Sequence, residues 1–376
     1  MRIRIITVPF NNNYGGYLQA FALMTILKRM GHEPTMIMRR HNPNAVSFLF
    51  RLKFFIKGLI KTIVKRKKYP CIYTCETFYK ERGKNMHTFV DKYIVPQTKY
   101  IYSTEDLRKT CYGKFDAYIV GSDQVWRSIY VPGIVGNMFL DFTKGWDVKR
   151  IAYAASFGTD TLEYSVDERN ICGKLIQKFD AISVREASGE KVIEDYGWMA
   201  RNIETVLDPT MLLNSEDYNR ILPSNESPAK GKIFCYILDK SENTSALVSA
   251  VSSELNKDIY EIADIQKGNS VLPSVEEWLS AIRDADFVIT DSFHGTVFSI
   301  ILNKNFYVCP NIDRGCVRFE ALLSRYGLLD RIIQSNKWKK RGCDVINWDM
   351  VRNIQKEEQE KSLNFLYEIL NSTGLE

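Results

Sequence analysis

The stretch TDSFHGTVFSI, residues 290–300, places a histidine between an aromatic residue and a glycine. His294 is one of four histidines in 376 residues, and it lies where an apolar run ends and a helical pattern begins. A helix N-terminus attracts anions, Gly295 lets the backbone approach a ligand, and an imidazole can transfer a proton near neutral pH. This turn therefore suits an anionic substrate and acid–base chemistry. The alternative is that Asp291 or Ser292 caps the helix and His294 is a buried structural residue.

A second apolar run, AISV at residues 181–184, is followed directly by Arg185. The planar guanidinium of arginine binds a carboxylate or a phosphate through two parallel hydrogen bonds, so Arg185 is a candidate ligand for an anionic substrate. The alternative is a surface ion pair with Glu186 or Glu190, which would contribute little to stability.

A third run, AYIV at residues 117–120, leads into the polar segment GSDQVW. Asp123 is placed to act as a base for a hydroxyl or to bind a sugar, and the alternative is that it caps a helix. Trp126 either stacks on a sugar ring or packs in the core. Ligands of open α/β sheets bind beyond the carboxyl ends of the strands, and all three segments follow predicted strands.

The first strand–helix turn, NNNYGG at residues 11–16, lacks the G-x-G-x-x-G spacing of dinucleotide-binding proteins. The chain has no G-x-S-x-G, Walker A or H-E-x-x-H motif either. Its eight cysteines show no paired spacing, so we expect free thiols and no metal site. We also expect that the protein uses no cofactor. The D-A-D triplet in RDADF is a weak alternative for a metal site, because it falls at a probable helix end.

The elements that must position these residues alternate between short apolar strands and amphipathic helices. This pattern predicts an α/β protein with two doubly wound Rossmann-like domains facing a cleft. A polar segment near residues 214–231 marks the boundary. We predict an N-terminal domain on the acceptor side at 1–213, a C-terminal domain on the donor side at 214–350 and a final helix at 351–376.

One basic segment departs from this pattern. Ten Lys and Arg residues and no acidic residue lie between Glu33 and Glu76, so the net charge of +6 is local and does not indicate nucleic-acid binding. Apolar residues and lysines recur at helical spacing on separate faces of residues 47–68, within an insertion at 47–70. We predict a basic amphipathic helix that binds an anionic membrane surface, and the alternative is packing on its own domain.

The location follows from the same apolar patterns. No run of about 18 uncharged apolar residues is present, and the apolar stretch at the start is too short for a signal peptide. We therefore expect a cytoplasmic protein, held peripherally on the inner face of the membrane through residues 47–68.

The chain resembles the polysaccharide pyruvyl transferase family in a series of ordered motifs. These motifs are NYGGYLQAFAL, FDAYIVGSDQVW, ASFG, SVREASG, VLDPTMLL, VITDSFHGTVFSI and RFEALLSRYGLLDR. The resemblance implies a GT-B-like fold, with phosphoenolpyruvate as the donor. The implied acceptor is a sugar of a cell-surface polysaccharide or of its lipid-linked precursor. The products would be a pyruvate ketal across two hydroxyls and phosphate.

Site residues follow from matching these motifs to the required chemistry. His294 is the expected proton source for the enol carbon, and Asp123 is the second catalytic candidate. The expected donor-binding residues are Arg185, Ser292, Gly295, Thr296 and Arg318. The expected acceptor-binding residues are Asn13, Gly15, Gly16, Gln124 and Trp126. The family pattern implies an arginine at the position of Ser292, and Arg318 is the candidate replacement.

Two other functions stay open at this point. One is a GT-B glycosyltransferase that uses a nucleotide sugar, and binding of a nucleoside diphosphate without phosphoenolpyruvate would favour it. The other is a non-enzymatic sugar- or lipid-binding protein on the same scaffold, which the serine at position 292 makes plausible. Donor binding without turnover would favour this second alternative.

Overall fold

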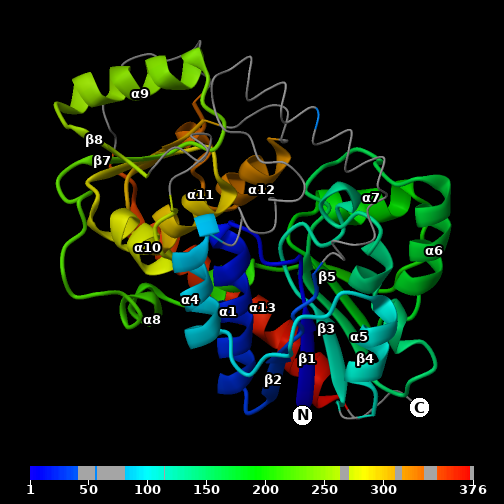
Figure 1. Cartoon of the computed structure of the whole chain (residues 1–376). Coiled ribbons are helices and arrows are strands. Elements are labelled where there is room, and N and C mark those ends of the chain that lie inside the picture. The colour runs from blue at the N-terminus through cyan, green and yellow to red at the C-terminus, as the bar shows by residue number, and fades with distance from the viewer. Residues whose placement is uncertain are drawn as a thin grey trace.

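The computed structural model describes residues 1–40, 56, 81–113, 115–262, 271–309, 316–333 and 345–372. Within these ranges the chain forms two parallel β-sheets with helices packed around them (Figure 1). This two-sheet α/β arrangement is the one that the alternating sequence pattern predicts. The predicted insertion at 47–70 lies outside the described residues, apart from Ile56.

The larger sheet has the parallel strand order β2-β1-β3-β4-β5-β6. Its central strands are almost continuous apolar runs, because helices cover both faces of the sheet. Its strands are β1 (Arg2–Ile6), β2 (Glu33–Met36), β3 (Ala117–Val120), β4 (Lys149–Ala155), β5 (Ala181–Val184) and β6 (Ile203–Thr205).

The smaller sheet has the parallel strand order β10-β9-β7-β8. All strands of the larger sheet precede residue 213, and all strands of the smaller sheet follow it. The strands of the smaller sheet are β7 (Ile233–Tyr236), β8 (Ile259–Glu261), β9 (Phe287–Thr290) and β10 (Phe306–Val308).

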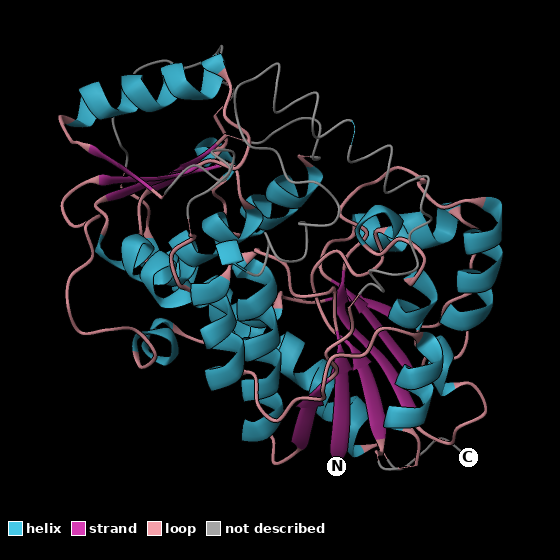
Figure 2. Ribbon diagram, viewed as in Figure 1, coloured by secondary structure: helices cyan, strands magenta, loops and turns pink. Residues whose placement is uncertain are grey.

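Helices connect the strands and cover the sheets (Figure 2). Helix α6 was not indicated by the apolar pattern, but it begins with a capping box formed by Ser165 and Glu168. None of the described helices has the length and apolar content needed to cross a membrane. The helices are α1 (Tyr14–Arg29), α4 (Lys84–Tyr93), α5 (Thr104–Cys111), α6 (Val166–Ile176), α7 (Ser188–Asp195), α8 (Ser215–Asn219), α9 (Glu242–Leu255), α10 (Val275–Asp284), α11 (Phe293–Ile301), α12 (Val317–Arg325) and α13 (Trp348–Asn371).

One apolar core runs through both domains, and Figure 1 shows α1 and α4 between the two sheets. Tyr14 of α1 stacks on Trp278 of α10, with ring centroids 5.0 Å apart. Helix α13 then returns to the larger sheet, where the Ser362 hydroxyl accepts a hydrogen bond from the Leu207 amide at 2.9 Å. The packing of α1 and α13 therefore holds the two halves of the chain against each other.

Candidate active site

A cavity of about 520 Å³ lies between the two domains, at the carboxyl ends of strands from both sheets. Ligands of doubly wound proteins bind at this edge. The N-terminal domain contributes the segments after β1 and β3, and the C-terminal domain contributes those after β7 and β9 together with α12. Residues in the lining include Asn13, Gly16, Asp123, Gln124, Ser292, Phe293, His294 and Arg318.

Helix α11 begins at this cavity, directly after β9. Ser292 is its N-cap, and the serine hydroxyl accepts a hydrogen bond from the Gly295 amide at 3.3 Å. The Thr296 hydroxyl donates to the Ser292 carbonyl at 3.1 Å, so Gly295 and Thr296 lie within the turn and not in the cavity lining. His294 stands in the first helical turn with its side chain in the lining. The capping role that the sequence left open for Ser292 therefore coexists with an imidazole at the cavity.

Two glycines leave room for this turn. A Cβ added at Gly295 would lie 2.4 Å from Oγ1 of Thr290, so the helix start packs tightly on β9. A Cβ added at Gly15 would lie 1.9 Å from Nδ1 of His294. Gly15 is absent from the residues lining the cavity, and its backbone instead packs against the imidazole.

Asp208, which follows β6, lies close to the other ring nitrogen of His294. Its Oδ2 atom is 3.7 Å from Nε2 of His294, which is close enough for charge interaction but too long for a hydrogen bond. The same oxygen accepts hydrogen bonds from Arg185 Nη1 at 3.0 Å and from Ser122 Oγ at 2.9 Å. Burial alone would raise the pKa of Asp208, but His294, Arg185 and a Thr210 hydrogen bond hold this pKa well below its usual range. Asp208 is therefore an ionised partner for the imidazole at neutral pH.

The N-terminal domain lines the cavity with Asn13 and Asp123, among other residues. Nδ2 of Asn13 donates to Oδ2 of Asp123 at 3.2 Å, while Oδ1 of Asn13 caps α1 by accepting from the Gly15 amide at 3.2 Å. Asp123 caps none of the described helices, and its φ of 73° is uncommon for a residue other than glycine. Such conformations persist where the surroundings enforce them, and they concentrate at functional sites. Within the described ranges, no group of three or more His, Cys, Asp or Glu side chains is placed to bind a metal.

The sequence of this chain matches one known protein family over most of its length. Residues 13–314 match the family described as polysaccharide pyruvyl transferase. The chain belongs to the polysaccharide pyruvyl transferase family. Comparison with curated proteins gives no match. The family assignment that the sequence motifs suggested is therefore confirmed, and this pyruvyl transferase family member is a transferase.

Solved structures confirm the GT-B-like fold. A putative UDP-N-acetylglucosamine 2-epimerase from Listeria monocytogenes superposes with a TM-score of 0.54 at 9% identity, over 99% of this chain and 97% of that chain. UGT89C1 of Arabidopsis thaliana, complexed with UDP-L-rhamnose, gives 0.53 at 10% identity over 98% of both chains. The UDP-GlcNAc 2-epimerase of Neisseria meningitidis, bound to UDP-GlcNAc, gives 0.50 at 8% identity over 97% and 100%. At these identities the similarity concerns the fold alone.

Arg185 of this pyruvyl transferase family member is enclosed beside the cavity and does not line it. Besides its bond to Asp208, it donates from Nε to Glu186 at 3.2 Å. Its guanidinium carbon lies 4.2 Å from the ring centroid of Phe293, which does line the cavity. Arg185 instead lines a small adjoining hollow together with Phe293 and Arg318, and its contact with a donor stays a prediction. The ion pair with Glu186 is present, but it is buried and not at the surface.

Arg318, the candidate replacement for the arginine that the family pattern implies at Ser292, lines the cavity. Its guanidinium carbon lies 5.9 Å from the ring centroid of Phe293, so this ring lies close to both Arg185 and Arg318. Burial and the nearby Arg185 cation lower the pKa of Arg318. Asp208 and Glu186 pair with Arg185, so Arg318 is a cation that the lining offers to an anionic ligand.

Trp126 belongs to the core. Its side chain is completely buried, stacks on Phe139 with ring centroids 5.0 Å apart, and donates from Nε1 to the Met138 carbonyl at 3.0 Å. The prediction that Trp126 stacks on an acceptor sugar was wrong, because neither face of the indole is available. Gln124, two residues earlier, does line the cavity.

Sequence reasoning missed the role of Asp208 and did not select Arg82 or Tyr130, which also line the cavity. Asp208 lies in the VLDPTMLL motif, just after an apolar run, which is the same signal that drew attention to Arg185 and Asp123. Arg82 and Tyr130 belong to no recognised motif. Arg82 lies just before α4, and Tyr130 is the last residue of a short 3-10 helix, Ser128–Tyr130.

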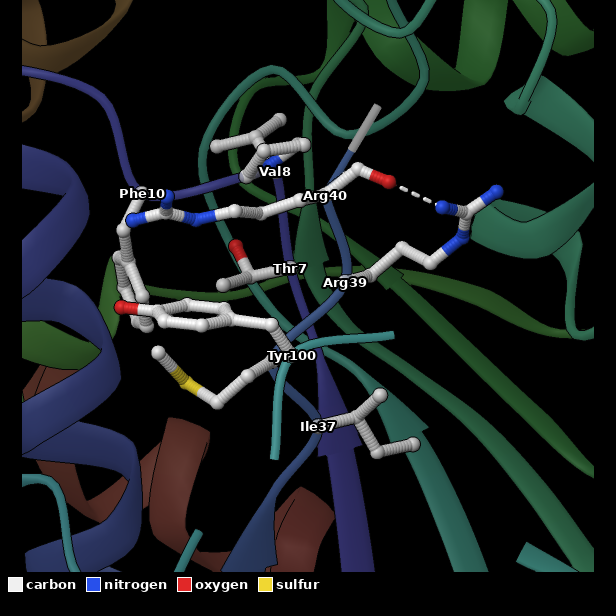
Figure 3. A pocket seen from close by; sticks show the side chains of 9 residues that line it. Thr7, Val8, Phe10, Ile37, Arg39, Arg40 and Tyr100 are labelled. Carbon is white, nitrogen blue, oxygen red and sulfur yellow. Dashed lines mark hydrogen bonds between the residues drawn. The ribbon is translucent and has the colours of Figure 1, made fainter. Parts of the chain in front are cut away.

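A smaller hollow adjoins the cavity and shares its residues Val8, Pro9 and Phe10. Figure 3 shows the guanidinium of Arg40 over the ring of Tyr100, with the guanidinium carbon 3.8 Å from the ring centroid. In the same view Arg39 donates a hydrogen bond to the Arg40 carbonyl. A cationic and aromatic surface therefore continues from the cavity past the carboxyl ends of β1 and β2.

Proposed function

We propose that this protein transfers the enolpyruvyl group of phosphoenolpyruvate to two hydroxyls of a sugar, in a cell-surface polysaccharide or its lipid-linked precursor. The observation that supports this most strongly is the position of His294. It stands in the first turn of α11 and lines a cavity of about 520 Å³ together with Arg318. A proton donor beside an anion site is what the chemistry of phosphoenolpyruvate requires.

The carboxylate and phosphate of the donor would bind at the start of α11 and at Arg318. The Ser292 hydroxyl already accepts from the Gly295 amide, but the amides of Phe293 and His294 occupy positions with no partner within a helix. These amides and the helix dipole favour an anion. Arg185 lines the small hollow beside Phe293 together with Arg318, and its predicted contact with the donor is part of this proposal.

In the proposed reaction, His294 gives a proton to the methylene carbon of the donor, which becomes a methyl group. Positive charge develops on the adjacent carbon, and the first sugar hydroxyl attacks it. The second hydroxyl then attacks the same carbon as the phosphate leaves. One hydroxyl proton restores the acid and the other leaves with the phosphate, so the atoms balance without a further reactant.

The acceptor would bind on the side of the N-terminal domain. Asp123, Asn13 and Gln124 present oxygen and nitrogen atoms at the cavity, and Gly16 leaves the wall between them without a side chain. Asp123 is the candidate base for a sugar hydroxyl, because it is the carboxylate that this domain places in the lining.

The test combines donor binding with turnover. The purified protein is incubated with phosphoenolpyruvate and a panel of nitrophenyl and lipid-linked sugars, and phosphate release is followed. We expect release that requires both substrates and yields a ketal-bearing sugar. Binding of UDP without binding of phosphoenolpyruvate would instead indicate a nucleotide-sugar enzyme. Donor binding without turnover on any acceptor would indicate a binding protein.

We also propose that the protein works at the cytoplasmic face of an anionic membrane, where a lipid-linked acceptor would be presented. The support is the sequence of residues 47–68, in which an apolar face and a lysine face recur at helical spacing. These residues lie outside the described part of the chain, apart from Ile56.

A further inference from the structure

Arg4 occupies an inward position of the larger sheet. Side chains alternate along β1, and Ile3 and Ile5 join the core on the α1 side. Arg4 therefore faces the other side with Ile6, which packs in the core that includes Leu107 of α5. The side chain of Arg4 is only 8% exposed. A cation thus stands where the strand pattern calls for an apolar residue.

The guanidinium of Arg4 has no counter-charge among the described residues. Its Nε and Nη1 atoms are buried without a hydrogen-bond partner, and its contact is with the ring of Phe115, whose centroid lies 4.0 Å from the guanidinium carbon. Buried arginines elsewhere have polar partners, since Arg127 binds Glu163 at 2.9 Å, Arg185 binds Asp208 at 3.0 Å and Arg39 donates to Asn137 at 2.9 Å. Burying an unpaired cation is costly. A bound anion would offset this cost, because the described residues supply no partner for Arg4.

Arg4 lines a cavity of about 550 Å³ that shares no lining residue with the cleft at His294. Polar side chains surround it, namely Thr35, Gln97, Thr98, Lys99 and Thr110. Asp106, a carboxylate in the lining, accepts from the Ser103 hydroxyl at 2.7 Å and is not among the groups that act on the charge of Arg4. A buried arginine, a rim lysine and several neutral donors are therefore gathered around one space.

We infer that this second cavity binds an oxyanion, a carboxylate or a phosphate, carried by a small polar molecule such as an acidic sugar. The Arg4 guanidinium lines this cavity, and a guanidinium matches carboxylate and phosphate geometry. Lys99 adds charge at the rim, and the hydroxyl and amide groups bind the rest of the molecule. This inference does not depend on the reaction proposed for the cleft.

The test needs a local signal, because anions also bind near Arg318. The Nε–Hε resonance of Arg4 is followed by NMR in the full-length protein and assigned through its loss in Arg4→Met. The protein is titrated with glucuronate, with inorganic phosphate and with neutral glucose, at constant ionic strength. We expect saturable shifts with glucuronate or phosphate and none with glucose. A response to glucuronate indicates an acidic sugar, and a response to phosphate alone indicates a phosphate group.

Variants give the second readout. Because Arg4→Met removes this resonance, binding to that variant is followed through the backbone amides of Thr98 and Lys99 in the cavity lining. Arg4→Met should weaken the binding of the responding anion about tenfold or more, as expected for loss of charge-assisted hydrogen bonds. Lys99→Gln, on the exposed rim, should weaken it severalfold while Arg4 still reports. Arg2→Met removes the same charge from an exposed position of the same strand and should leave affinity unchanged. An Arg4 resonance that no anion shifts would overturn the inference, as would equal losses of affinity in Arg2→Met and Lys99→Gln.

Discussion

Gly15 and His294 lie in different domains and are in direct contact, because a Cβ at Gly15 would stand 1.9 Å from Nδ1 of the imidazole. On the other side of the ring, Nε2 lies 3.7 Å from the Asp208 carboxylate. The imidazole is thus held between the backbone of α1 and a carboxylate that follows β6. Its position at the cavity depends on the packing of the two domains.

Gly15→Ala should therefore displace the imidazole. We expect a loss of turnover of about 100-fold, the scale that follows from misplacing a catalytic group by about 1 Å. Stability should change little, because the ring can move and alanine favours a helix. The measurements are phosphate release and urea unfolding. Gly121→Ala is the control, since its added Cβ would meet its nearest neighbour at an ordinary 3.5 Å. Full activity in Gly15→Ala would show that the contact does not position the imidazole.

His294→Gln removes the proposed acid without opening the cavity. We expect turnover to fall by about 100- to 10,000-fold, the usual range for general acid–base catalysis. Binding of phosphoenolpyruvate, measured by calorimetry, should persist because Arg318 and the helix N-terminus remain. His32→Gln, outside the cavity lining, is the matched control. Unchanged phosphate release in folded His294→Gln would exclude the imidazole from the reaction.

Asp208→Asn removes one of the two buried carboxylates that pair with Arg185 and leaves Glu186 as the other. Removing one partner of a buried ion pair typically costs about 3–5 kcal/mol of unfolding free energy. Urea unfolding at neutral pH measures this cost. Asp195→Asn, which removes the partner of the exposed Lys191, should change stability little. A similarly small effect of both substitutions would show that the Asp208–Arg185 pair does not stabilise the fold.

The Asp208 carboxylate also makes the free energy of unfolding depend on pH. Because the pKa of Asp208 is depressed in the folded protein, its stabilisation is present above the unfolded pKa of about 4 and is lost as the pH falls below that value. The difference in stability between the parent and Asp208→Asn should therefore be largest near neutral pH and shrink in acid. A difference that stays constant down to pH values well below 4 would contradict this linkage.

Arg318→Gln should weaken donor binding more than acceptor binding. Charge-assisted hydrogen bonds contribute about 1.5–3 kcal/mol, so we expect the Kd for phosphoenolpyruvate to rise roughly 10- to 100-fold. Arg325→Gln on the same helix is the control, because Arg325 pairs with Glu358 at 3.0 Å and does not line the main cavity. Superimposable donor titrations of parent and Arg318→Gln would show that Arg318 does not replace the arginine implied at Ser292.

The membrane proposal predicts salt-sensitive binding to vesicles. Parent protein should co-sediment with anionic vesicles at low salt, less at high salt and not with neutral lipid. Changing Lys53, Lys57, Lys61 and Lys65 to Gln should abolish co-sedimentation and keep activity on a water-soluble acceptor. Equal sedimentation of parent and variant would contradict the proposal.

The alternation of strands and helices, the family and the place of His294 could all be predicted from the sequence. These features are local, because an apolar run, a cap and a glycine act on neighbouring residues. The helix that begins at Phe293 after β9 is the clearest case, since the cap and the strand end are both visible in TDSFHGT. The apolar runs AYIV and AISV likewise form β3 and β5 at the residues predicted.

The contacts of these residues could not be predicted in the same way, because they depend on the packing of the whole fold. Trp126 and Gln124 are two positions apart, yet one is buried against Phe139 and the other lines the cavity. Arg185 follows a strand as predicted, but Asp208 and Glu186 enclose it. Burial and charge pairing depend on which faces meet across long separations in the chain, and no local pattern encodes that. Gly15 supports His294 for the same reason, because their contact exists only where the two domains pack together.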